Sequence, residues 1–303
     1  MDRFEAMRVF CTVIEAGGFA AAADRLGQST SAVSRNVAQL EAHLNVRLLN
    51  RTTRRMSPTD EGFAYFERCT QLLADLDETE AAVSGVAQHP RGRLRLTAPI
   101  ALATLDLAPA FAAFSQRYPD VSLDIQLSDG LTDFVEAGLD LAIRVGRVGS
   151  DNLVARHLAN AELIVAAAPD YLTRHGEPAT PEELAQHPCL TYAYAALGNH
   201  WQFAGPAGES VSVRANGPIN SNNGVLLAEM AAAGCGITHA PDFILRPLIA
   251  DGRLQRILAD WHTPALPIHA VYPTRRHLSA KVQAMTAFLT EWFRSPERKA
   301  AVG

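Results

Sequence analysis

The stretch FAAAADRLGQSTSAVSRNVAQLE, residues 19–41, decides the fold of the amino-terminal part of the chain. Its first half repeats apolar residues at the i, i+3, i+4 and i+7 spacing of an amphipathic helix: Phe19, Ala22, Ala23 and Leu26. Gly27 suits a tight turn, and Ser29 is a good N-cap for a second helix that we expect to reach Leu44. The inward face of that second helix is Val33, Val37, Leu40 and Leu44.

The outward face of the second helix is short and polar at its start. It carries Thr30, Ser31, Ser34, Arg35 and Asn36. Short hydroxyl and amide side chains reach base edges in the major groove without holding the helix away from them. The pattern therefore predicts a helix-turn-helix with a recognition helix over residues 29–44, although an ordinary pair of packed helices has the same spacing.

The segment after this helix favours contact with DNA. Asn45 tolerates the left-handed conformation that ends a helix. In VRLLNRTTRRMSP, residues 46–58, apolar residues alternate with arginines and threonines, which predicts a short hairpin or wing. Arg51 and Arg54 on this wing would contact phosphates or a narrow minor groove, and the alternative is a merely solvated surface.

Two further helices flank this motif. A helix from about Phe4 to Ala16 would complete a three-helix core. Thr59 can cap a long helix from Asp60 to about Gln88. The apolar stripe of the long helix needs a covering surface, from which we expect dimerisation. The stripe consists of Phe66, Cys69, Leu73, Leu76 and Val83.

The composition of the 303 residues is that of a soluble globular protein with about two domains. The net charge of −5 divides unevenly, because residues 1–60 hold eight arginines against six carboxylates. A basic end on an acidic chain fits a site-specific DNA reader rather than a protein that coats nucleic acid. No long apolar run or basic leader is visible, so we expect a cytoplasmic protein.

Residues after Arg91 alternate between strands and helices, which predicts an α/β fold with largely parallel pairing. The expected strands are 93–98, 121–127, 139–145 and 163–168, and the expected helices are 107–117, 133–137 and one that starts at Thr180. A further helix should begin in NSNNGVLLAEMAAAGCG, residues 220–236, with Ser221 or Asn222 as its cap. Its free N–H groups would suit an anion or polar ligand, and capping alone explains the asparagines equally well.

Residues 1–88 resemble the amino-terminal part of a LysR-type transcriptional regulator, through AVSRNVAQLE, then LNVRLLNRTTRRMSPTDEG, then the long helix. Thr30 and Asn45 depart from the glutamine and glycine frequent in that family, as do Leu49 and Pro58 from phenylalanine and leucine. Residues 91 to about 295 resemble the family's effector-binding domain through LRLTAPIAL, FSQRYPDVSLDIQLSD and FVEAGLDLAIRVG, then DGRLQRIL and LPIHAVYP.

The resemblance implies a domain order. A winged helix-turn-helix DNA-binding domain would span residues 1–60, with the motif itself at about 19–38, and a linker and dimerisation helix would span 61–89. An α/β effector-binding domain would span 90–303. This last domain would consist of two subdomains with crossing strands, similar to periplasmic binding proteins, with a small-molecule cleft between them.

The resemblance also implies ligands and partners. The partners would be an operator in double-stranded DNA, a second copy in a homodimer or tetramer, and RNA polymerase, without a membrane, a metal or a bound cofactor. The effector would be a small molecule, for which a small carboxylate is one class and an uncharged aromatic compound or an amino acid another. Candidate effector-binding residues at strand ends and at the helix start are Thr97, Pro99, Ile100, Ser128, Gly146, Asn222, Asn223 and His239.

Other classes of protein fit less well. An enzyme is not favoured because the sequence has no GxSxG, no GxGxxG after a strand, no P-loop and no HExxH motif, so no catalytic residue is assigned. A solute-binding protein would need a signal peptide. Cys11, Cys69, Cys189 and Cys235 lack CxxC spacing, so we expect buried reduced thiols, with a redox pair of Cys189 and Cys235 as the alternative. A thiol-based sensor would require an accessible cysteine of low pKa.

Overall fold

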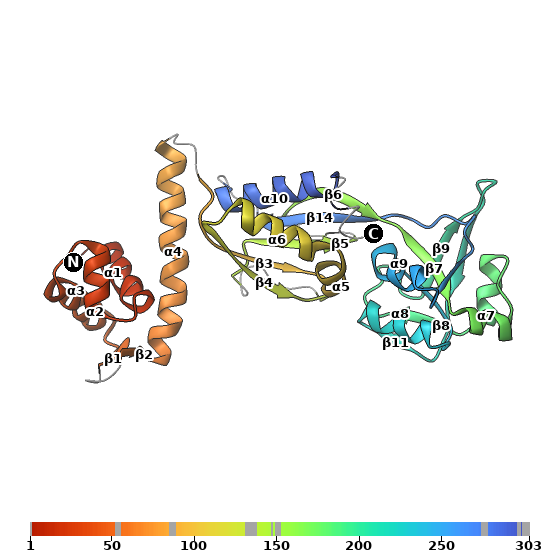
Figure 1. Ribbon diagram of the computed structural model, residues 1–303, viewed down its shortest axis with the longest axis horizontal. Coiled ribbons are helices and arrows are strands. Elements are labelled where there is room, and N and C mark those ends of the chain that lie inside the picture. The colour runs from red at the N-terminus through yellow and green to blue at the C-terminus, as the bar shows by residue number, and fades with distance from the viewer. Residues whose placement is uncertain are drawn as a thin grey trace. The chain divides into compact units, whose positions relative to one another are not determined.

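The structure is a computed structural model that describes residues 2–51, 56–84, 89–130, 138–146, 148, 153–273, 278–295 and 298. The chain divides into two compact units, Met1–His89 and Pro90–Gly303 (Figure 1). Each unit has its own hydrophobic core and is described separately below.

The first unit is a three-helix core followed by a hairpin and a long helix. Its elements are α1 (Arg3–Glu15), α2 (Phe19–Leu26), α3 (Thr30–Leu44), β1 (Leu49–Arg51), β2 (Met56–Pro58) and α4 (Asp60–Ser84). The predicted ends of the helices are confirmed. Gly27 is left-handed with φ of 63°, Asn45 is left-handed with φ of 53°, and the Ser29 hydroxyl accepts the Ala32 N–H at 3.2 Å. The caps at Gly27 and Ser29 end α2 at Leu26 and begin α3 at Thr30, so a three-residue turn joins the two helices as in a helix-turn-helix.

The apolar stripe of α4 lies against its own unit. Cys69 is fully buried and Leu73 nearly so, in the same core as Phe10 of α1 and Val37 of α3, with Phe66 packed beside them. These predicted seam residues are therefore covered by α1 rather than left for a partner. The side chain of Val83 and the predicted end of the helix at residues 85–88 lie outside the described residues.

No helix in the described part of the chain is long and apolar enough to cross a membrane.

The second unit contains two α/β subdomains. In the first subdomain the sheet order is β4-β3-β5-β14-β6, and helices α6 and α10 pack on one face. Its elements are β3 (Gly92–Ala98), α5 (Ile100–Leu102), the π-helix η1 (Ala103–Leu107), α6 (Ala108–Arg117), β4 (Val121–Leu127), β5 (Leu141–Val145), β6 (Leu153–Ala161), β14 (Leu266–Pro273) and α10 (Ala280–Trp292).

In the second subdomain the sheet order is β11-β8-β12-β7-β13. Helices α8 and α9 contribute to the core on one face of this sheet, while α7, η2 and the β9-β10 hairpin contribute to the core on the other. Its elements are β7 (Leu163–Ala167), α7 (Pro169–His175), the 3-10 helix η2 (Pro181–Gln186), β8 (Cys189–Tyr192), β9 (His200–Ala204), β10 (Ser210–Arg214), β11 (Asn220–Ser221), α8 (Gly224–Ala232), β12 (Ile237–Pro241), α9 (Asp242–Ala250) and β13 (Gln255–Ile257).

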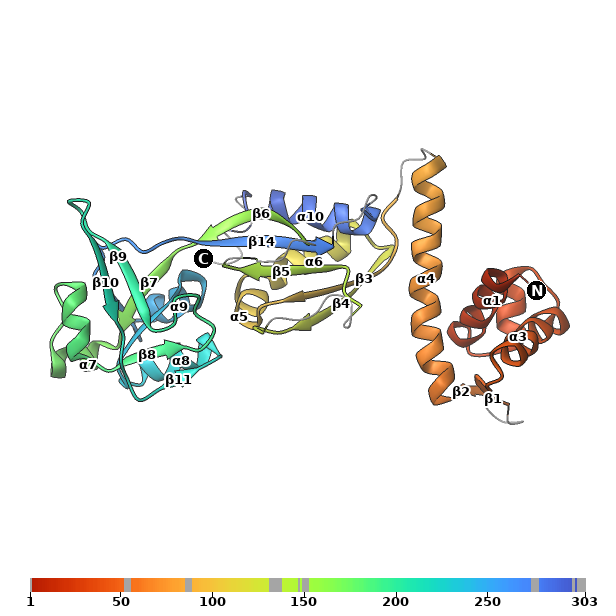
Figure 2. The same cartoon turned by 180° about the vertical axis from the view of Figure 1, so that it is seen from behind.

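Two crossings connect the subdomains. Only Glu162 separates β6 in the first sheet from β7 in the second, and the chain returns after β13 to form β14. Figure 2 shows β6 and β14 side by side in the first subdomain, with β6 leading into the second subdomain and β14 returning from it. Because both crossing strands pair antiparallel, the sheets are mixed, and the expectation of largely parallel pairing is wrong for this unit.

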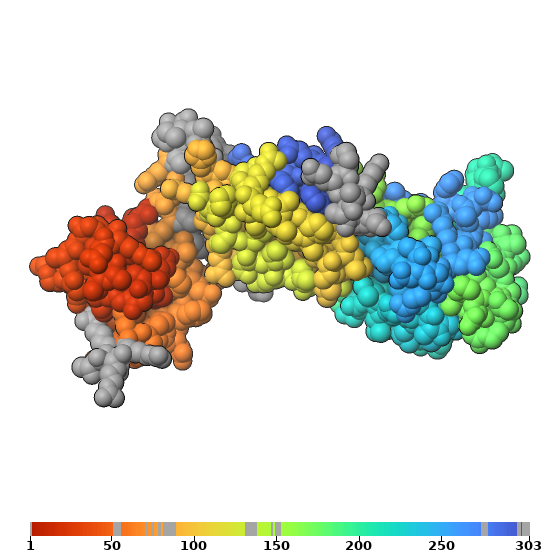
Figure 3. Space-filling view, viewed as in Figure 1, coloured from red at the N-terminus to blue at the C-terminus, as the bar shows by residue number. Residues whose placement is uncertain are grey.

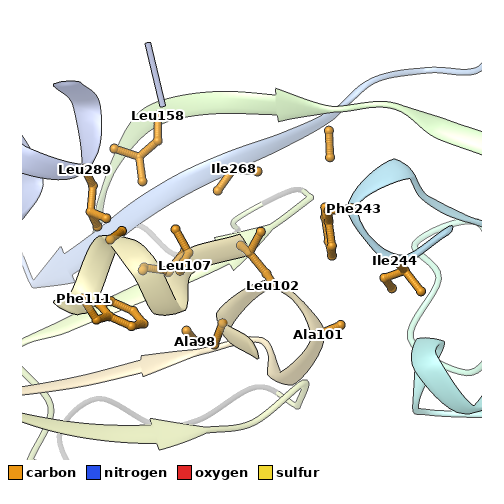
Figure 4. Close-up of a cluster of buried hydrophobic side chains, with 14 of the residues drawn as sticks. Ala98, Ala101, Leu102, Leu107, Phe111, Leu158, Phe243, Ile244, Ile268 and Leu289 are labelled. Carbon is orange, nitrogen blue, oxygen red and sulfur yellow. The ribbon is translucent and has the colours of Figure 1, made fainter. Parts of the chain in front are cut away.

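The core of the second unit continues from one subdomain into the other. In Figure 4, Leu102 and Leu107 lie near Ile268, while Ala101 of α5 lies on the side toward Phe243 and Ile244 of α9. Figure 3 shows the surfaces of these two regions in contact. The segment that follows β3 therefore meets the second subdomain directly.

Several predicted elements differ in their details. The predicted helix at 133–137 lies outside the described residues. The segment after Thr180 forms a 3-10 helix, and α6 is preceded by a π-helix rather than starting at Leu107. The cap of α8 is Asn223, not Ser221 or Asn222, because the Asn223 side chain accepts the Leu226 N–H at 2.9 Å.

Candidate functional site

The recognition helix α3 has one buried face and one polar face. Val33, Val37 and Leu40 are at most 1% exposed, so they fix the rotation of the helix. On the opposite face, the predicted contact residues Thr30, Ser31 and Arg35 are exposed, and Ser34 and Asn36 are half-buried. The structure thus brings five of the seven predicted DNA contacts together on one helix.

The wing is tied to the recognition helix by a carboxylate. Glu41 of α3 accepts the backbone N–H groups of Leu48 and Leu49 with one oxygen, at 2.9 and 3.0 Å. Both leucines are 1% exposed, so these amides depend on Glu41 rather than on water. The first strand of the wing therefore keeps a fixed register on α3.

Thr59, between β2 and α4, links the start of the wing to α4. The Thr59 hydroxyl donates to the Arg47 carbonyl at 2.8 Å and accepts the Gly62 N–H at 2.9 Å, which confirms Thr59 as the cap. A Cβ on Gly62 would lie 1.9 Å from the Leu48 carbonyl oxygen, so only glycine fits there. The Arg51 side chain and all of Arg54 lie outside the described residues.

Five predicted effector residues gather at one edge of the first sheet. The parallel strands β3, β4 and β5 end there, so Thr97, Ser128 and Gly146 lie at their carboxyl ends. Thr97 is 1% exposed, and its hydroxyl has no hydrogen-bond partner among the described residues. Pro99 and Ile100 begin α5, where Asp129 accepts the Ile100 N–H at 3.0 Å. This edge is where α/β sheets bind ligands.

The three predicted residues of the second subdomain, Asn222, Asn223 and His239, have different surroundings. Asn222 is exposed, whereas the side chain of Asn223 is used by its own helix. His239 points to the other face of its sheet, where its ring lies 4.9 Å from that of Trp201 and 5.9 Å from that of Phe203. Burial lowers the pKa of His239 to about 4, so its ring is neutral at pH 7.

Sequence reasoning missed four residues near the edge of the first sheet: Arg144, Asp129, Tyr192 and Tyr194. Arg144 of β5 has a buried Nη2 without a partner among the described residues. Burial lowers the pKa of Arg144, and the negative charge of Asp129 partly opposes this. Burial, with a smaller contribution from Asp129, raises the pKa of Tyr192 to about 12. The Tyr194 hydroxyl also approaches this edge, 3.9 Å from where a Cβ on Gly130 would lie. The available signal was the single charge in the apolar run LAIRVG, residues 141–146.

Three of the four thiols are buried, away from the surface position that a thiol-based sensor needs. Cys11, Cys69 and Cys189 are buried, and burial raises the pKa of Cys189 to about 11. Cys235 is exposed, so the expectation that all four thiols are buried is wrong for this one. The interior position of Cys189 disfavours thiolate chemistry there.

Comparisons with known proteins agree with this architecture. Residues 4–63 match the family model described as "Bacterial regulatory helix-turn-helix protein, lysR family", and residues 87–294 match the "LysR substrate binding domain". The regulator CrgA of Neisseria meningitidis serogroup B is 35% identical over 288 residues, which cover 95% of this chain and 96% of that protein. The regulator DmlR of Escherichia coli K12 is 35% identical over 291 residues, which cover 95% and 93%.

Solved structures give the same result. The structure of CrgA from Neisseria meningitidis has a TM-score of 0.61 at 34% identity and covers 96% of this chain and 99% of that one. The full-length structure of the Vibrio cholerae virulence activator AphB has a TM-score of 0.60 at 28% identity, with coverage of 96% and 99%. With both family models matched in order along nearly the whole chain, the protein belongs to the LysR family of helix-turn-helix transcriptional regulators, which bind DNA and carry an effector-binding domain.

Proposed function

We propose that α3 reads the operator in the major groove through Thr30, Ser31, Ser34, Arg35 and Asn36. The observation that carries this proposal is the short polar face at the start of α3, exposed directly opposite a fully buried face. The positive end of the helix dipole adds attraction for phosphate. Arg51 and Arg54 of the wing contact the DNA backbone or minor groove, and the Glu41 bonds to the wing support this arrangement.

We further propose that the effector binds at the carboxyl edge of the first sheet, next to the second subdomain. Three of its contacts there are the expected ones at the ends of parallel strands, Thr97, Ser128 and Gly146. The remaining expected contacts are Pro99, Ile100, Asn222, Asn223 and His239. Of these, His239 has the weakest support, because Trp201 and Phe203 pack against its ring.

The assembly we propose is a homodimer or tetramer in the cytoplasm, bound to a partly palindromic operator and in contact with RNA polymerase. In this assembly, residues 1–60 would bind DNA, residues 61–89 would form the dimer contact and residues 90–303 would bind the effector. The 25-residue α4 exposes 54% of both Phe63 and Leu72, which is apolar surface that a second copy would cover.

The experiment that tests operator reading is a mobility shift with the intergenic DNA beside the gene, in the presence of competitor DNA and at several salt concentrations. A discrete complex that survives the competitor is the expected result. Loss of every complex under competitor, at all salt concentrations tested and on the upstream DNA of each neighbouring gene, would contradict a site-specific regulator.

Variants then separate the two parts of the interface. Replacing Arg51 by alanine should weaken binding to all sequences and reduce the salt dependence by about one phosphate contact. Replacing Ser34 or Arg35 by alanine should change the preference among operators that differ by one base pair. Arg214→Ala, in the second unit, is the matched control. Equal losses on every sequence from both kinds of change would refute the division of roles.

A further inference from the structure

We propose that the group that selects the effector is Arg144, and that the effector carries a carboxylate which binds between Arg144, Thr97 and His269. This inference rests on the effector site proposed above and adds the chemical class of its ligand. All three residues lie on one face of the first sheet, opposite the face that packs on α6 and α10.

The strand register places the three side chains next to one another. Arg144 on β5 pairs directly with His269 on β14. Thr97 on β3 pairs with Ala142 on β5. Ala142 lies two residues before Arg144, so both side chains are on the same face of the sheet. Side chains on directly paired residues start about 5 Å apart, and diagonal neighbours about 7–8 Å apart, so one small molecule can touch all three.

Each residue presents a buried polar atom that lacks a partner. These atoms are the Thr97 Oγ1, the Arg144 Nη2 and the His269 Nδ1, and none of them has a hydrogen bond within the described part of the chain. Buried polar atoms are nearly always paired in folded proteins. Three unpaired atoms on neighbouring strands therefore indicate a site that a ligand completes rather than a packing accident.

The charges around the cluster favour an anion. The other terminal nitrogen of Arg144 makes only a 3.4 Å contact, to the Ile143 carbonyl, and no described carboxylate forms an ion pair with this guanidinium. The charge of Asp129 partly opposes the lowering of the pKa of Arg144 by burial, but one oxygen of its carboxylate already accepts the Ile100 N–H. On the other side, burial and then His157 lower the pKa of His269, while a backbone hydrogen bond with Gly146 opposes them, and the neutral ring donates from Nδ1 in one of its two tautomers.

A planar oxyanion matches this set of donors. A guanidinium binds a carboxylate through two parallel N–H bonds, and a hydroxyl and an imidazole N–H can each donate to the same oxygens. The start of α8 is a poorer anion site, because Asn222 is exposed and Asn223 is occupied by its own helix. A carboxylate is thus better placed at Arg144 than at the helix start suggested by sequence.

The first arm of the test needs no ligand. Thermal unfolding of the full chain can be followed by its tryptophans, which all lie in the second unit at 201, 261 and 292. Arg144→Met removes a half-buried charge that has no ion-pair partner among the described residues and keeps a similar volume, so the variant should melt about 2–4 °C higher than the parent. Arg156→Met, on exposed β6 of the same sheet, is the control and should change little. A lower melting temperature for Arg144→Met would show that the guanidinium is paired and would overturn the proposal.

The second arm uses defined probes at constant ionic strength and pH 7.5: acetate, succinate and benzoate, each compared with its amide, and inorganic phosphate. At least one carboxylate should raise the melting temperature of the parent and of Arg156→Met above the value with its amide. The same probe should bind Arg144→Met at least about 10-fold more weakly, and Thr97→Val more weakly as well. Stabilisation by phosphate alone, or by no carboxylate over its amide, would overturn the carboxylate class.

The operator mobility shift on the same proteins separates the two proposals. Arg144→Met should still form the discrete complex with DNA, because Arg144 lies in the other unit from α3. A protein that binds its operator but ignores all carboxylates would refute only the effector class, whereas loss of operator binding by the parent chain would refute the regulatory function itself.

Discussion

The carboxylate of Glu41 should control both the stability of the wing and its contact with DNA. One oxygen of Glu41 accepts two buried N–H groups, from Leu48 and Leu49. A hydrogen bond to a charged group contributes about 1.5–3 kcal/mol, and an orphaned buried donor costs about 1–3 kcal/mol. Because both bonds share one oxygen, we expect Glu41→Ala to lower the free energy needed to open the wing by about 3 kcal/mol.

A matched variant distinguishes the acceptor from the side chain as a whole. Glu41→Gln keeps a carbonyl oxygen at the same reach but without the charge, so it should cost only about 1 kcal/mol. Glu61→Ala removes an exposed carboxylate in the first turn of α4 and is the control.

Amide hydrogen exchange is the suitable assay, because the first unit contains no tryptophan. Exchange of the Leu48 and Leu49 amides should be about 100-fold faster in Glu41→Ala and less than about 10-fold faster in Glu41→Gln. Operator binding by Glu41→Ala should also lose part of its salt dependence, since the wing no longer keeps its register. Unchanged exchange at both amides in Glu41→Ala would refute the assignment of Glu41 as their acceptor.

Two further outcomes follow from the geometry. Gly62→Ala should destabilise the first unit by about 3 kcal/mol, the upper range for overpacking, because the added Cβ would meet the Leu48 backbone. The control Gly18→Ala places its Cβ in open space and should be tolerated. Similar amide exchange rates across residues 46–62 in the two variants would contradict this prediction. The pKa of His239 is about 4 in the folded chain and 6.5 in the unfolded chain, so the unfolded chain binds more protons between these pH values. The second unit should therefore lose about 2 kcal/mol of stability as the pH falls from 7.5 to 5. Urea unfolding followed by the fluorescence of Trp201 should show this loss, and His239→Gln should flatten it; an equal pH dependence in the variant would assign the loss to other groups.

The parts of the fold that sequence predicted well are those set by local contacts. The cap at Ser29 and the left-handed residues Gly27 and Asn45 act on backbone groups within about one helical turn, so a short window of sequence contains both partners. The polar face of α3 follows from the same window. This is why the sequence could predict, residue by residue, which side chains form the polar face of α3.

Contacts between distant segments were not predictable in the same way. The stripe of α4 reads as a free dimer seam, yet Cys69 and Leu73 pack on α1, a helix more than 50 residues away. The register that aligns Arg144 with His269 depends on β14 returning from the second subdomain. Periodicity shows which face of an element is apolar, but not which element covers it.

The location of the three unpaired atoms limits how an effector can act. A ligand shifts an equilibrium between two arrangements only if it binds one of them better. Thr97, Arg144 and His269 all belong to the first subdomain, so by themselves they would bind a carboxylate equally well in any arrangement of the two subdomains. The second subdomain reaches this edge through Tyr194, which approaches Gly130, and through Tyr192, whose pKa is raised in part by the charge of Asp129. In the proposed site, affinity for the carboxylate would therefore come from the first sheet, and the difference in affinity that regulation requires would come from the part of the ligand that meets these tyrosines.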